Sequence, residues 1–342
     1  IPINPYPSML VPGSIPRIIL SKSSNKLGTF FKLLYKNTFF ISLAVFALAI
    51  YFLYHNIVNY TNLMELWHLF LSAQVQMVLV AIILLQFVNW VIEAFKFKVL
   101  LQLPEKPKIQ LIIKAIYIGN FTALLTPERI GNFVGRSWVL KSIKKDTIVS
   151  TILGNYVQFC ITIVIAFISL LLLSQHTQIS YHLPNENFII LVYFIFSIIL
   201  IISFIHLKWV TMFSKVTYLN SWFQSIYKLV ELTSRKKVQV ICLSFLRYMI
   251  FVFQFYIMSI AFGLPLDFYS IFIIVGVMFG VVTLIPSLIP GNLGTKEAFL
   301  MILLGSGPMG IKFSIISFSI WTINVGFSAL IGAGFNLSLI HI

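Results

Sequence analysis

The chain has 342 residues, of which 59% are hydrophobic and 10% are charged, and its formal net charge is +15. Soluble domains carry about 25% charged residues, so the composition excludes a soluble globular protein and predicts an all-α polytopic membrane protein. The positive charge does not predict a nucleic-acid partner, because no DNA- or RNA-binding motif accompanies it. It indicates basic cytoplasmic loops that face anionic lipid headgroups.

Residues 1–38 are predicted to form a basic, proline-rich arm on the cytoplasmic side. Five prolines lie within the first sixteen residues and disfavour regular structure. Residues 39–335 are expected to form one transmembrane domain, followed by a short tail at 336–342. A spanning helix needs about 20 residues, and six apolar runs are predicted to cross the membrane: 39–54, 75–101, 147–173, 188–207, 238–262 and 313–335.

The distribution of Lys and Arg predicts the orientation of these runs. Three loops contain neither residue: 55–74, 174–187 and 263–268. Three other segments contain five, ten and six of the chain's 24 Lys and Arg residues: 1–38, 96–145 and 208–237. The positive-inside rule places the basic segments and the N-terminus in the cytoplasm, and we expect the protein in the cell inner membrane. A full crossing by residues 109–125 would leave five cations outside, so a re-entrant hairpin with its tip at 126–131 is the simpler prediction.

A proline-glycine pattern in the first half of the chain recurs in the second. Pro127 and Gly131 are four residues apart, as are Pro290 and Gly294. In each half, a Leu-Pro dipeptide further upstream is followed by a glycine fifteen residues after the proline. Matched positions in the same order indicate an internal duplication.

The duplication predicts a second re-entrant hairpin, at residues 269–304, which enters from the outside. The fold class we expect is therefore two inverted repeats, 39–173 and 188–335, each with three spanning helices and one hairpin. This is an architecture of secondary transporters. A competing topology, in which residues 269–289 cross fully and the C-terminus lies outside, stays open.

Polar and charged residues gather at both breaks, where we expect the site. Those near the first break are Glu128, Arg129, Asn132 and Arg136; those near the second are Asn292, Lys296 and Glu297. Intramembrane ionisable residues are expensive and usually functional, and free N–H groups beside Lys or Arg can bind phosphate. The alternative is a set of internal ion pairs, such as Arg129 with Glu297, that only stabilise the fold. The prolines and glycines that shape the breaks are Pro127, Gly131, Pro290, Gly291 and Gly294.

Two other places in the apolar runs carry charge. Arg247 lies ten residues into the fifth run without a nearby acid, so it needs a partner or a cavity and is a candidate site residue. Glu93 and Lys96 are three residues apart, and we interpret them as a structural i,i+3 pair. No cofactor, metal site or catalytic motif is expected, because none of the usual signatures is present.

The two breaks resemble the motifs of the lysylphosphatidylglycerol-synthase transmembrane family, also called flippase-like. The family shows Pro-x-x-x-Gly-Glu…Arg and Pro-Gly-Gly-Leu-Gly-x-x-Glu. Here these read Pro127-Glu-Arg-Ile-Gly131-Asn132…Arg136 and Pro290-Gly-Asn-Leu-Gly294-Thr-Lys-Glu297. The resemblance covers most of residues 35–335. Asn replaces the family's Glu at 132 and its Gly at 292, so the headgroup preference does not carry over.

The resemblance implies a lipid translocase that moves a phospholipid or lipid-linked anionic headgroup between leaflets, through a midplane cavity between the hairpins. Arg129, Arg136 and Lys296 would hold the phosphate, and Glu128 and Glu297 would position them or a cationic headgroup. The alternatives are a secondary transporter of a small anionic solute and a non-transporting scaffold. Membrane lipids are the expected partners, and a homo-oligomer is compatible with the sequence. Lysyl transfer is not expected, because only about seven residues follow the last apolar run.

Overall fold

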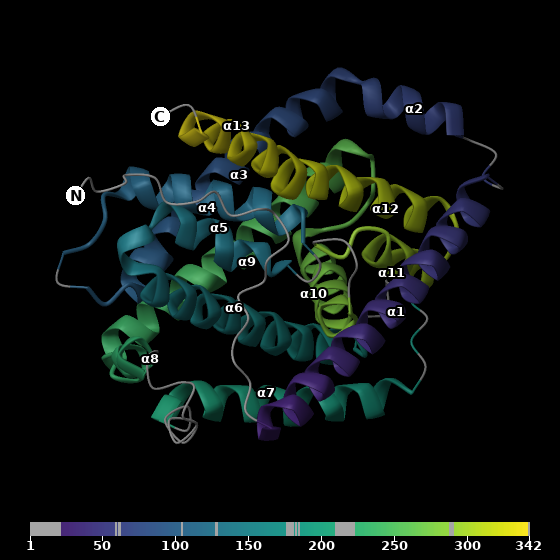
Figure 1. The fold of residues 1–342 in the computed structure, drawn as a ribbon. Helices are drawn as coiled ribbons and strands as arrows, with labels where there is room; N and C mark the ends of the chain where they lie inside the picture. The colour runs from purple at the N-terminus through teal and green to yellow at the C-terminus, as the bar shows by residue number, and fades with distance from the viewer. Residues whose placement is uncertain are drawn as a thin grey trace, which may run out of the picture. The chain divides into compact units, whose positions relative to one another are not determined.

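A computed structural model of the chain describes residues 22–340, except for residues 59, 61–62, 104, 127–128, 176–180, 182, 184, 209–222 and 287–290. The first half contains α1 (Lys22–Val58), α2 (Leu63–Leu71), α3 (Ala73–Leu100), α4 (Ile109–Leu124), α5 (Gly131–Val139) and α6 (Lys144–Leu173) (Figure 1). The second contains α7 (Glu186–Ile205), α8 (Phe223–Val230), α9 (Ser234–Ala261), α10 (Phe268–Leu284), α11 (Thr295–Leu304), α12 (Pro308–Trp321) and α13 (Ser328–Ile340). A π-helical segment, Thr322–Phe327, joins α12 to α13. Residues 1–41 and 42–342 form separate units, and every contact described below lies within the second.

The prediction of six spanning helices is confirmed by length and composition. Among the described residues, six helical stretches are long and apolar enough to cross a membrane: Phe40–Val58, Ala73–Leu100, Lys141–Leu173, Glu186–Ile205, Ser234–Ala261 and Pro308–Leu337. They coincide with the six apolar runs of the sequence. The apolar helices α4 and α10 have only 16 and 17 residues. The fold is therefore an all-α membrane protein with shorter helices between its spans.

Two short helices, α2 and α8, lie where the sequence predicted loops. They have 9 and 8 residues, too few for a search for long apolar runs to detect. α2 is amphipathic, since Leu66 is buried against Met301 and Ile311 whereas Trp67 is exposed. Each of the two helices follows the first spanning helix of its half, so both halves share one order of elements.

α4 and α5 form an antiparallel helical pair around the first break. The Thr122 hydroxyl donates to the Gly131 carbonyl over 2.6 Å, and the Gly131 N–H donates to the Thr126 hydroxyl, also over 2.6 Å. A Cβ at Gly131 would lie 2.0 Å from the Thr122 carbonyl oxygen, and one at Gly135 would lie 2.2 Å from the Thr122 hydroxyl. Glycine at both positions lets α5 fold back closely along α4.

Two equivalent pairs of helices join the two halves. α4 of the first half packs against α13 of the second, and α10 of the second half packs against α6 of the first. Small residues bring these helices together: a Cβ at Gly332 would lie 2.0 Å from the Tyr117 carbonyl oxygen, and one at Gly280 would lie 2.2 Å from Ala166 Cβ. α3 packs against α9, which has the same place in the second half as α3 has in the first. The candidate functional site lies at this contact.

Candidate functional site

The helix that follows the first break places Arg136 next to the buried carboxylate of Glu93 on α3. Glu93 Oε1 lies 3.1 Å from Arg136 Nη2 on α5, and Oε2 lies 2.7 Å from Lys96 Nζ. Oε2 also forms an ion pair with Arg247 Nη1 on α9. The local pair of Glu93 with Lys96 is confirmed, but its interpretation as merely local is wrong. Three helices meet at this carboxylate, and we call Glu93, Lys96, Arg136 and Arg247 the Glu93 cluster.

Each guanidinium of the Glu93 cluster is held by an amide as well as by the carboxylate. Arg136 Nε donates to Asn132 Oδ1 over 2.8 Å, one helical turn earlier on α5. Arg247 Nε donates to Asn89 Oδ1 over 2.9 Å, across the α3–α9 contact. Each guanidinium carbon also lies 5.2 Å from the centre of an aromatic ring: Phe97 for Arg136 and Trp90 for Arg247. A carboxylate, an amide and an aromatic ring therefore hold each arginine in place against α3.

The Glu93 cluster carries more positive than negative charge. One carboxylate faces three cations, which leaves a formal surplus of two positive charges among side chains that are 10% exposed or less. Arg136 Nη1 and Asn89 Nδ2 are also buried without a hydrogen-bond partner among the described residues. A buried unpaired donor costs about 1–3 kcal/mol. An anion bound here would balance the surplus positive charge and would accept hydrogen bonds from the unpaired donors.

Arg129 adds a further cation beside the cluster. Its backbone is left-handed, with a φ of 60°, and the residue as a whole is exposed, although the charged end of its side chain is surrounded by protein. Its guanidinium interacts electrostatically with Arg247, Arg136 and Glu93. Pro127 and Glu128, the two motif residues before it, lie outside the described residues. The first break thus places a further arginine next to a buried, positively charged cluster.

The second break is held by Glu297, which caps α11. Its Oε2 accepts from the Gly294 N–H over 2.7 Å, and its Oε1 accepts from the Ser317 hydroxyl of α12 over 2.7 Å. Lys296 Nζ lies 3.3 Å from Glu297 Oε1 and donates to the Ser317 carbonyl over 3.1 Å. Both charged side chains are buried. The pair is neutral, and each member has partners within the chain.

The backbone before α11 explains the glycines of the second motif. Gly291, Asn292 and Gly294 have φ values of 78°, 54° and 82°, a region that glycine adopts easily and asparagine tolerates. The Asn292 amide donates to the carbonyl of Val282 at the end of α10. Asn292, which stands where the family motif has glycine, therefore ties the break to the preceding helix. Pro290 lies outside the described residues.

Residues 39–330 match a protein family described as the lysylphosphatidylglycerol synthase TM region. The match spans most of the chain and includes both breaks. The chain belongs to this family. No curated protein and no solved structure matches the chain.

In this member of the family, the predicted site residues fall into two groups. Arg136, Asn132 and Arg247 come together at Glu93, whereas Lys296 and Glu297 lie against α12. The proposed pairing of Arg129 with Glu297 is replaced by that of Lys296 with Glu297. Among the described residues, no hydrogen bond or ion pair joins the two groups. A cavity shared by the two breaks stays a prediction.

Sequence reasoning missed the centre of the first group. The sequence assigns Glu93 a structural role because Lys96, three positions away, already supplies a local partner, and Asn89 carries no signal of its own. One signal was available: Arg247 required a buried acid, and Glu93 is the acid within the long apolar run of α3. The pairing spans 154 residues of sequence, so only the packing of α3 on α9 reveals it.

Proposed function

We propose that this protein moves a phospholipid, or a lipid-linked anionic headgroup, between the leaflets of the cell inner membrane. The observation that carries the proposal is the surplus of two positive charges in the buried Glu93 cluster. Charges are costly to bury unless they are matched. Ionisable residues inside membrane segments commonly mark substrate paths. Membership in a family of membrane regions from lysylphosphatidylglycerol synthase supports a lipid substrate.

In this proposal the lipid phosphate supplies the missing negative charge. Arg136 would offer its free Nη1 donor, and Arg247 would add a second guanidinium on the opposite helix. Arginine suits this role because its planar fork can bind phosphate through two parallel hydrogen bonds. Arg129, which lies beside the cluster at the first break, would add a third guanidinium for the headgroup phosphate. Glu93 would keep the cations in place when the site is empty and limit the affinity, so that the lipid can leave.

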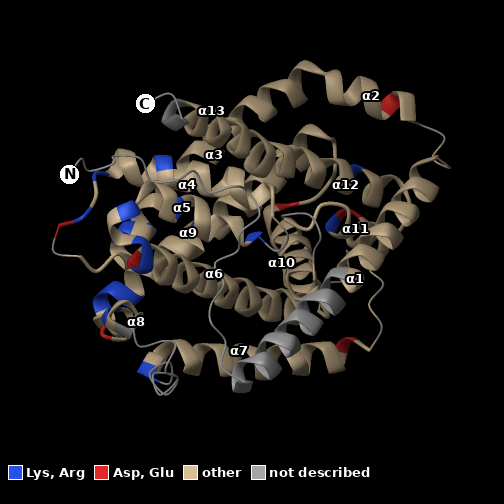
Figure 2. Cartoon of the chain, in the orientation of Figure 1, with Lys and Arg blue, Asp and Glu red and all other residues tan. Residues whose placement is uncertain are grey.

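We further propose that α4–α5 and α10–α11 are re-entrant hairpins in two inverted repeats. A helix of 16 residues is about 24 Å long, shorter than the hydrocarbon core of about 30 Å. The equivalent helices α3 and α9 run antiparallel, because Asn89 contacts Arg247 whereas the earlier Ile82 contacts the later Gln254. Lys and Arg gather around α8 and the first turns of α6 (Figure 2), which supports a cytoplasmic position for that end.

The test is lipid scrambling by purified protein in liposomes, with fluorescent phosphatidylglycerol and dithionite quenching of the outer leaflet. The expected result is quenching beyond the outer-leaflet fraction in the absence of ATP, and its loss in an Arg136→Gln, Arg247→Gln double variant. A matched control is Lys228→Gln, which removes one member of the peripheral pair with Asp146. No scrambling above that of empty liposomes, with or without a pH gradient, would contradict the proposal.

The same liposomes separate the alternatives. A transporter of small anionic solutes would admit a labelled soluble phosphate ester but would leave phosphatidylglycerol in its leaflet. A scaffold would do neither. Either result, obtained with protein that is shown to be folded and correctly inserted, would replace the lipid assignment.

A further inference from the structure

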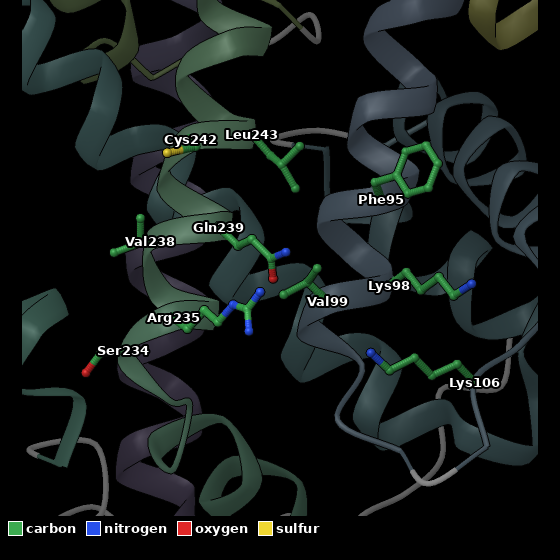
Figure 3. A pocket seen from close by; sticks show the side chains of 10 residues that line it. All are labelled: Phe95, Lys98, Val99, Lys106, Ser234, Arg235, Val238, Gln239, Cys242 and Leu243. Carbon is green, nitrogen blue, oxygen red and sulfur yellow. The ribbon is translucent and has the colours of Figure 1, made fainter.

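A second basic site lies on the outer surface of the α3–α9 pair, near the end of α3 and the start of α9. A pocket of about 740 Å³ opens there between the two helices and the loop that follows α3 (Figure 3). Three cations line it: Lys98 on α3, Lys106 in the loop and Arg235 in the first turn of α9. They come from three different elements, so the positive charge arises from the folded arrangement.

The cations of the pocket are not paired with acidic side chains in the part of the chain that the structure describes. Among the described residues, Lys98, Lys106 and Arg235 form no ion pair. The pKa of Lys106 is lowered from its ordinary value by partial burial and by repulsion from Lys236 and Lys98. Lys236, which lies just outside the pocket, donates to the Gln102 side chain and adds a fourth positive charge nearby. An anion bound here would offset mutual repulsion among these cations.

The other end of the pocket is apolar and belongs to the spanning helices. The apolar lining residues are Phe95 and Val99 of α3 and Val238 and Leu243 of α9, and Figure 3 shows Phe95 and Leu243 at the end away from Lys106 and Arg235. Phe95 is 49% exposed and Val238 is 58% exposed as whole residues. A soluble anion would gain little from such a wall, whereas an acyl chain would bury apolar surface against it.

This pocket is distinct from the Glu93 cluster although both use α3. Phe95 and Lys98 lie on the outer face of the helix, while Glu93 and Lys96 are buried on the inner face. None of the pocket residues contacts the carboxylate of Glu93 by a hydrogen bond or ion pair in the described part of the chain.

We propose that this pocket binds one anionic phospholipid from the leaflet at the Lys- and Arg-rich end of the protein. The phosphate lies among Lys98, Lys106 and Arg235, and an acyl chain follows the groove between Phe95 and Leu243. Lipid binding in this pocket does not require translocation, so its test is independent of the test of the proposed function.

Native mass spectrometry of the detergent-purified protein, titrated with dioleoyl phosphatidylglycerol or dioleoylphosphatidylcholine, tests the charge requirement. We expect phosphatidylglycerol to bind more tightly, and the Lys98→Gln, Lys106→Gln, Arg235→Gln variant to lose about tenfold or more of that affinity, since charge-assisted hydrogen bonds are lost. The matched control is Lys141→Gln, Lys144→Gln, Lys145→Gln, which removes equal charge from exposed positions elsewhere. Equal affinity for the two lipids, or an equal loss in both variants, would overturn the proposal.

Cys242 provides a second readout, because its exposed thiol lines the pocket and the chain's other cysteine, Cys160, is buried. We expect phosphatidylglycerol to slow alkylation of Cys242 by N-ethylmaleimide, and inorganic phosphate at the same concentration to have no effect. Equal protection by inorganic phosphate would replace the lipid with a soluble anion. The Lys141→Gln, Lys144→Gln, Lys145→Gln control variant should keep the protection, whereas the Lys98→Gln, Lys106→Gln, Arg235→Gln variant should lose it.

Discussion

Replacing Glu93 with glutamine removes the one negative charge of the Glu93 cluster and keeps nearly the same side-chain shape. The formal surplus then rises from two to three positive charges among Lys96, Arg136 and Arg247, all of which contact this carboxylate. Removing one partner from a buried ion pair costs about 3–5 kcal/mol. That is a large part of a typical folding free energy of about 5–15 kcal/mol. We therefore expect Glu93→Gln to lower the midpoint of thermal unfolding substantially.

The effect of lipid on the unfolding midpoint of Glu93→Gln tests whether the cluster binds an anionic ligand. A ligand that binds only the folded state stabilises it by mass action, and an anion should bind the more positive variant more tightly. Phosphatidylglycerol should therefore raise the unfolding midpoint of Glu93→Gln more than that of the wild type, whereas phosphatidylcholine should not. Intrinsic tryptophan fluorescence during heating in mixed micelles measures both effects.

The control for this prediction is Asp146→Asn, the same chemical change at a peripheral pair. The partner Lys228 is 40% exposed, and such pairs contribute about 0–1 kcal/mol, so we expect a small shift that no lipid alters. If Glu93→Gln were no less stable than Asp146→Asn, the cluster would not be buried as described. If phosphatidylglycerol stabilised both variants equally, the link between the surplus charge and an anionic ligand would be refuted.

Three further predictions concern the breaks and the topology. Gly131→Ala should strongly lower the unfolding midpoint, because the new Cβ would meet the Thr122 carbonyl at 2.0 Å; an unchanged midpoint would contradict the α4–α5 packing. Gly294→Leu should also destabilise the protein through its φ of 82°, and scrambling by this variant at the wild-type rate would exclude a role for the second break in transport. In a background without native cysteines, Gly307→Cys should react with an impermeant maleimide from outside and Ser142→Cys from the cytoplasm. Cytoplasmic labelling of both would refute the second re-entrant hairpin.

The sequence predicted the spanning helices because long apolar runs are sufficient to identify them, and all six reappear as helices. It did not predict α2 and α8, whose 9 and 8 residues are too few to stand out in loops assigned by charge. It predicted that Arg247 needs a partner, but not that Glu93 provides it. That pairing depends on how α3 packs on α9, and hydropathy carries no information about the register of two distant helices.

The central claim is that the Glu93 cluster receives the phosphate of a lipid. An experimental structure of the protein in nanodiscs rich in phosphatidylglycerol tests it most directly. We expect headgroup density within hydrogen-bond distance of Arg136 Nη1 and the Arg247 guanidinium, with the acyl chains extending into the bilayer. A cluster closed around Glu93, with both arginines bound only to protein and water at saturating lipid, would contradict it.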